Sequence, residues 1–137
     1  MIKSHQLNLQ KLGPLGAEII GLDLSEPLDK TLLESIKHKL LEHLVLVFRN
    51  QSLTLYNLLQ VSKFWGRPLK HPAFSGIDGN PEIIRIQNYG KKYHTNAHWH
   101  SDVTFEEYPP DITLLYAVQV PDQGGNTLFS NQYLAYE

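Results

Sequence analysis

The chain has 137 residues, enough for one domain of ordinary size. Hydrophobic residues make up 42% and charged residues 19% of it, and the net charge of −2 includes no basic block, so neither nucleic acid nor a membrane is indicated as a partner. Because the chain has no cysteine, disulfides and thiol nucleophiles are excluded, and because its first residues lack the apolar core of a signal peptide, we expect a cytoplasmic protein.

The N-terminal third of the chain predicts a strand followed by a helix. Residues 16–24 alternate loosely between glycine-bearing turns, which is typical of a strand. The helix is capped by Asp29 or by Thr31, since Thr31 and Glu34 fit the spacing of a capping box. Its expected apolar stripe consists of Leu32, Leu33, Ile36, Leu40, Leu41 and Leu44.

The rest of the chain predicts short strands with few helices. The apolar run 45–48 predicts a buried strand, and Thr54 begins a second helix that Gly66 ends. Ser130 is the expected N-cap of a last helix. Between these two helices we expect strands over residues 83–87, 112–118 and 126–129, a loop over 88–97 and a turn over 121–125. Strands outnumber helices, so the predicted fold class is mostly β with flanking helices.

A His-x-Asp pair, formed by His100 and Asp102, lies in a run that predicts extended chain. Residues i and i+2 of a strand share one face, so these two side chains are expected to point the same way. They represent two of the three ligands in the two-histidine-one-carboxylate triad that holds non-haem Fe(II). On spacing alone, a surface ion pair is the other interpretation.

His98 lies on the same face and raises the possibility of a three-ligand cluster. Residues i and i+4 of a strand are about 13 Å apart along its axis, too far for one metal ion unless the strand bends. We therefore assign His98 to the surroundings of the pair rather than to its ligands.

Ordered motifs along almost the whole chain resemble the N-terminal half of the taurine dioxygenase / 2,4-dichlorophenoxyacetate dioxygenase family. They are GAEIIGLDL at residues 16–24, VLVFRNQSLT at 45–54, FWG at 64–66, WHSDVTF at 99–105, GGNTLF at 124–129 and AYE at 135–137. The resemblance implies one truncated dioxygenase domain over residues 1–137. Its fold would be a partial double-stranded β-helix (jelly roll) that lacks the C-terminal strands.

The same resemblance implies a reaction and a set of site residues. The family hydroxylates small organic acids, sulfonates such as taurine among them, with Fe(II), O2 and 2-oxoglutarate as co-substrate. His100 and Asp102 would be catalytic iron ligands, and Thr127 would bind a carboxylate of 2-oxoglutarate. His71 and Asn96 fall at substrate-binding positions, and Phe74 stands where the taurine enzyme has a tyrosine. The alternative is that His71 and Asn96 are ordinary loop residues and that Thr127 is an ordinary strand residue.

The family also has a second histidine ligand and an arginine that pairs with 2-oxoglutarate, both in its C-terminal half. No histidine or arginine follows Asp102 in this sequence. The chain alone is therefore expected to be inactive. Three interpretations stay open: a portion of an enzyme, a non-catalytic remnant that acts as an interaction module, and a chain whose missing histidine and arginine come from a complementing C-terminal chain. A half jelly roll exposes unpaired strand edges, so a homo-oligomer is also expected.

Overall fold

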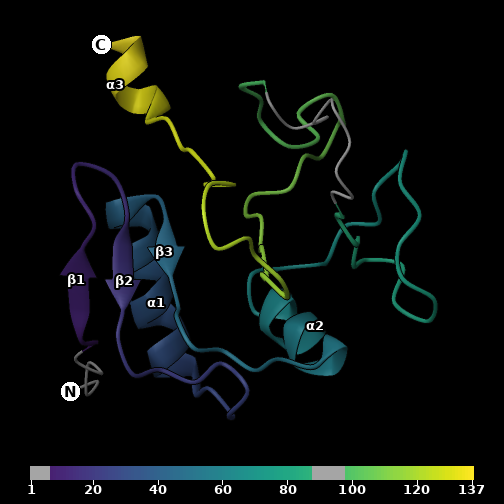
Figure 1. Ribbon diagram of the computed structural model, residues 1–137, viewed down its shortest axis with the longest axis horizontal. Helices are drawn as coiled ribbons and strands as arrows, with labels where there is room; N and C mark the ends of the chain where they lie inside the picture. The colour runs from purple at the N-terminus through teal and green to yellow at the C-terminus, as the bar shows by residue number, and fades with distance from the viewer. Residues whose placement is uncertain (1–6, 88–97) are drawn as a thin grey trace. The chain divides into compact units, whose positions relative to one another are not determined.

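The computed structural model describes residues 7–87 and 98–137. They belong to two compact units, which we call unit 1 (Met1–Thr54 with Ala117–Glu137) and unit 2 (Leu55–Tyr116). The elements in chain order are β1 (Leu9–Lys11), β2 (Ala17–Ile19), α1 (Lys30–His43), β3 (Leu46–Val47), α2 (Leu55–Lys63) and α3 (Gln132–Tyr136) (Figure 1). The predicted loop over residues 88–97 lies outside the described residues.

Unit 1 is built on a three-stranded sheet in the order β1-β2-β3. β1 pairs with β2 antiparallel, with Leu9 opposite Ile19, and β2 pairs with β3 in parallel, with Ala17 opposite Leu46. Helix α1 covers one face of this sheet (Figure 1). Ala17 and Ile19 share a face of β2 because they are two residues apart, and both are buried, as is Ile36 of α1. The core of unit 1 therefore lies between β2 and α1.

Helix α1 begins at the first of the two predicted caps. The carboxylate of Asp29 accepts a hydrogen bond from the backbone N–H of Leu32 at 2.8 Å, which satisfies one of the unpaired donors of the first turn. The apolar stripe is narrower than predicted, because Leu41 is 70% exposed. Five positions after the buried Ile36, Leu41 is rotated about 140° around the helix axis, which turns it away from the sheet.

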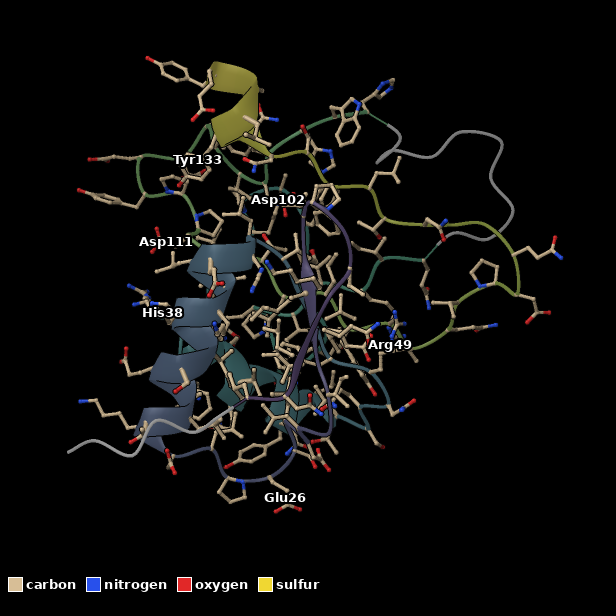
Figure 2. All side chains as sticks on the ribbon, turned by 90° about the vertical axis from the view of Figure 1, so that its left-hand side faces the viewer. Glu26, His38, Arg49, Asp102, Asp111 and Tyr133 are labelled. Atoms are coloured by element: carbon tan, nitrogen blue, oxygen red, sulfur yellow. The ribbon has the colours of Figure 1, made fainter. Side chains whose placement is uncertain are left out.

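Polar side chains after β3 tie that segment to the one after β2. The amide oxygen of Gln51 accepts from the backbone N–H of Leu24 at 2.8 Å, and its nitrogen donates to the carbonyls of Leu22 and Arg49. The guanidinium of Arg49 (Figure 2) pairs with Glu18 of β2 at 2.9 Å. Arg49 and Gln51 of the motif at residues 45–54 therefore have a structural role in unit 1.

The strands predicted over residues 83–87, 112–118 and 126–129 do not appear in the described part of the chain. Apolar alternation decides which side chains share a face, but a strand also needs a neighbouring segment to pair its backbone N–H and C=O groups. The three strands that do form hold 3, 3 and 2 residues, against 14, 9 and 5 in the helices. Helices therefore outweigh strands in the described residues, where a mostly β chain was predicted, and the jelly roll stays a prediction.

The C-terminal segment keeps the predicted turn and helix, with one change at the cap. Gly124 and Gly125 both adopt positive φ, at 77° and 70°, as a glycine turn requires. Helix α3 is capped by Asn131 instead of Ser130, because the Asn131 side-chain oxygen accepts from the backbone N–H groups of Tyr133 and Leu134. Among the described residues, no helix has both the length and the apolar character needed to cross a bilayer.

Candidate metal centre

His100 and Asp102 lie in unit 2, where residues 99–101 have no regular structure and a turn begins at Asp102. Residues 102–105 form a turn in which the backbone N–H of Glu106 donates to the carbonyl of Val103 at 3.2 Å. Val103 has a φ of 52°, an unusual value for a β-branched residue. The predicted strand around His100 and Asp102 is therefore wrong for the described residues 98–105, because the backbone bends at His98 and closes on itself from Asp102 onward.

The two side chains nevertheless face each other, as predicted. The Nε2 atom of His100 lies 3.3 Å from Oδ1 of Asp102 (labelled in Figure 2). The other ring nitrogen, Nδ1, lies 2.8 Å from the backbone carbonyl of His98. A carbonyl oxygen can only accept, so Nδ1 must carry the proton in this contact. In the neutral ring, Nε2 then presents a lone pair toward the Asp102 carboxylate.

This arrangement fits two neighbouring ligands of one metal ion. An imidazole lone pair and a carboxylate oxygen repel each other unless a cation lies between them or the ring is protonated. Ligands at right angles, each about 2.1 Å from a metal ion, are separated by about 3 Å, close to the 3.3 Å between Nε2 and Oδ1. The imidazole–carboxylate donor set is also the one that non-haem Fe(II) takes. With side chains 52% and 45% exposed, the surface ion pair remains the alternative.

A threonine that the sequence did not single out completes the local arrangement. The hydroxyl of Thr113 donates a hydrogen bond to Oδ2 of Asp102 at 2.9 Å. Burial alternates along residues 112–116, where Ile112, Leu114 and Tyr116 are half-buried and Thr113 and Leu115 are exposed. The contact joins residues eleven positions apart, and no local pattern in the sequence encodes it.

His98 acts on the pair through its backbone. Its carbonyl orients the His100 ring, while its own side chain is exposed. Within residues 7–87 and 98–137, no group of three or more histidine and acidic side chains is placed to hold one metal ion. The two predicted ligands that lie together among the described residues are His100 and Asp102, and His98 and Thr113 contact them.

His71 and Phe74 form a second local arrangement in unit 2. Nδ1 of His71 accepts hydrogen bonds from the backbone N–H groups of Ala73 at 3.0 Å and Phe74 at 3.2 Å. The two rings lie with centroids 4.6 Å apart and tilted by 44°. Because Nδ1 accepts, the ring proton must be on Nε2, which can donate to an anionic group. The substrate-binding role of both residues stays a prediction.

The structure does not join the remaining predicted residues to the pair. Thr127 is exposed in unit 1, on a segment between Gly125 and α3 that has no regular structure. Asn96 lies outside the described residues. The roles of Thr127 toward 2-oxoglutarate and of Asn96 toward substrate therefore stay predictions.

Comparison with known proteins gives a consistent family. The model of the taurine catabolism dioxygenase TauD, TfdA family matches residues 8–137. An alkylsulfatase of Acinetobacter baylyi is 39% identical over 136 residues, which are 98% of this chain and 42% of the relative. An alpha-ketoglutarate-dependent sulfate ester dioxygenase of Pseudomonas putida is 35% identical over 126 residues, 91% of this chain and 41% of the relative.

A solved structure is similar as well. A crystal structure from Burkholderia xenovorans, assigned as an alpha-ketoglutarate-dependent taurine dioxygenase, superposes with a TM-score of 0.65 at 30% identity. The match covers 76% of this chain and 38% of that one. The chain thus spans less than half the length of each of these proteins.

Proposed function

Since the chain belongs to the taurine catabolism dioxygenase TauD, TfdA family, we propose that it carries part of the Fe(II) centre of a 2-oxoglutarate-dependent dioxygenase. In this proposal His100 and Asp102 are the metal ligands that the chain contributes. The substrate class is a small organic acid, with sulfonates and sulfate esters as the first choices. The names of the Pseudomonas and Burkholderia relatives support both the co-substrate and this substrate class.

The observation that carries the proposal is the orientation of the His100 ring. The carbonyl of His98 engages Nδ1, which leaves Nε2 to face the Asp102 carboxylate at 3.3 Å. Metal-binding histidines usually donate their other ring N–H in this way, because the contact fixes both the tautomer and the direction of the lone pair. In a surface ion pair the imidazolium would also donate from Nδ1 to this carbonyl, so metal binding is the measurement that separates the two interpretations.

The residues of the chain then take distinct roles. An Fe(II) ion bound here would supply the oxidation of the substrate coupled to decarboxylation of 2-oxoglutarate. A neutral imidazole and one carboxylate only partly offset the charge of such an ion, which favours an anionic co-substrate. Thr127 would donate its hydroxyl to a carboxylate of 2-oxoglutarate. His71 would donate from Nε2 to an acidic group of the substrate, beside the Phe74 ring.

Metal binding by the 137-residue chain tests the proposal. Mn(II), a paramagnetic stand-in for Fe(II), is titrated into the chain while the free ion is measured by electron paramagnetic resonance. We expect His100→Ala and Asp102→Ala each to weaken binding by more than about 100-fold, since even residues that only support metal ligands are worth 10- to 100-fold.

The matched control is His38→Ala, which removes an exposed imidazole from α1 (Figure 2). This variant should bind Mn(II) as the unsubstituted chain does. Unchanged binding in His100→Ala would place the metal elsewhere and reject the site.

A second function, that of an interaction module, is favoured by one observation. Large apolar side chains of the C-terminal segment are highly exposed: Val118 (86%), Val120 (69%), Leu128 (71%), Tyr133 (74%) and Tyr136 (94%). Exposed apolar surface of this kind is typical of protein–protein contacts. A chain that associates with itself or a partner but binds no Mn(II) would favour this function over the dioxygenase.

A further inference from the structure

The Asp102 carboxylate is contacted at both of its oxygens by different side chains. Oδ1 lies 3.3 Å from Nε2 of His100, and Oδ2 accepts the hydroxyl hydrogen bond of Thr113 at 2.9 Å. We infer that Thr113 is a positioning residue, which sets the plane of the Asp102 carboxylate so that Oδ1 alone is offered to the metal. This inference rests on the proposed function, because it deepens the account of the same site.

The physical need for such a residue follows from the freedom of an aspartate side chain. The last torsion of aspartate is broad and roughly two-fold, so an exposed carboxylate samples many orientations. Asp102 is 45% exposed, and packing alone does not fix it. A hydroxyl that donates to one oxygen of an ionised carboxylate makes a charge-assisted hydrogen bond, which holds the plane of the group.

Engaging Oδ2 also limits how Asp102 can bind a metal ion. A free carboxylate can bind through one oxygen or chelate through both. A centre of the facial-triad type must keep open positions for its substrates. With Oδ2 occupied by Thr113, chelation by Asp102 is disfavoured, so one further position stays open.

Threonine is well suited to this task. Its two heavy atoms on Cβ restrict χ1, so the hydroxyl is held in fewer orientations than that of serine. The Thr113 side chain is exposed on the alternating segment 112–116, so its hydroxyl does not fill a core position. A role limited to local packing therefore predicts little effect from its removal.

The test compares Thr113→Val, which keeps the shape and removes the hydroxyl, with Thr113→Ser, which restores the donor. Thr104→Val is the matched control, because Thr104 is an exposed threonine of the turn that begins at Asp102. Mn(II) affinity of the 137-residue chain is the first measurement. We expect Thr113→Val to lose about 10- to 100-fold in affinity, as supporting residues of metal sites do. Thr113→Ser should recover most of that loss, and Thr104→Val should bind normally.

A second measurement separates orientation from folding. The side-chain carboxyl ¹³C resonance of Asp102, recorded without metal, should move in Thr113→Val and stay in place in Thr113→Ser. The midpoint of thermal unfolding should be the same in all three variants.

The outcomes distinguish a failure of the positioning role of Thr113 from a failure of the proposed metal site. Mn(II) binding that is lost in His100→Ala but kept in Thr113→Val overturns the positioning role and leaves the proposed function standing. An unsubstituted chain that binds no Mn(II) overturns both.

Discussion

Two histidines of unit 2 have Nδ1 engaged by the backbone, with opposite consequences. Nδ1 of His100 donates to the carbonyl of His98, whereas Nδ1 of His71 accepts from two backbone N–H groups. In the neutral rings, Nε2 of His100 therefore presents a lone pair and Nε2 of His71 presents an N–H donor. A lone pair suits a cation and a donor suits an anion, so these backbone contacts fit the proposed roles of His100 toward a metal ion and of His71 toward an anionic group.

The His71 tautomer can be tested with two substitutions. His71→Asn offers a side-chain oxygen at the place of Nδ1, whereas His71→Ala leaves the N–H groups of Ala73 and Phe74 without their acceptor. We expect the alanine variant to be less stable by about 1 kcal/mol, the usual net worth of a hydrogen bond, and the asparagine variant to be close to the unsubstituted chain. Urea unfolding measures the difference.

Amide hydrogen exchange locates the effect of the same two substitutions. Faster exchange at residues 73 and 74 in His71→Ala only would support the acceptor role of Nδ1. Equal exchange in both variants would contradict it. Binding of an anionic substrate should weaken in both, because each removes the Nε2–H donor.

At the scale of elements, the start of helix α1 decides between two capping schemes. Asp29 accepts from the N–H of Leu32 at 2.8 Å, and it is the N-cap of α1. We expect Asp29→Ala to lower the free energy of unfolding by about 1 kcal/mol, the typical worth of an N-cap side chain. Thr31→Ala, one residue inside the helix, is the control and should cost clearly less. Thermal unfolding that shows the larger loss for Thr31→Ala would restore the capping-box interpretation.

Elements that carry local signals were predictable from the sequence. The predicted segment 16–24 contains β2, the run 45–48 contains β3, and the helix expected from Thr54 is α2. Each of these strands has its partner among the described residues, since β2 pairs with both β1 and β3. The local sequence pattern was sufficient to predict these strands because each strand has a neighbouring strand with which its backbone can pair.

Elements that depend on distant pairing were not predictable in the same way. Residues 112–116 keep the alternating burial of a strand, yet no described segment pairs with them. At the candidate metal centre, too, the contact between near neighbours was predictable and the contact between distant residues was not. The proximity of His100 and Asp102 followed from their spacing, although the described chain has no strand there and a turn begins at Asp102. The Thr113 contact joins residues eleven positions apart and had no local signal.

At the scale of the whole molecule, the C-terminal segment combines apolar exposure with little charge. Residues 117–137 contain Asp122 and Glu137 as their only charged side chains. Val118 is 86% exposed, Leu128 71% and Tyr136 94%. Charged residues usually prevent exposed apolar segments of different chains from associating. Two acidic groups in residues 117–137 oppose such association only weakly.

We therefore expect the 137-residue chain to self-associate in a concentration-dependent way, through this segment. Val118→Lys replaces an exposed apolar side chain by a charge, and Gln119→Lys adds the same charge at the exposed neighbouring position. Burying a valine side chain contributes about 1.5 kcal/mol or more, so Val118→Lys should raise the dissociation constant by about tenfold. Gln119→Lys should leave it nearly unchanged. Sedimentation velocity over a range of concentrations measures both. A chain that stays monomeric throughout, or that responds equally to both substitutions, would show that apolar contact at this segment does not drive association.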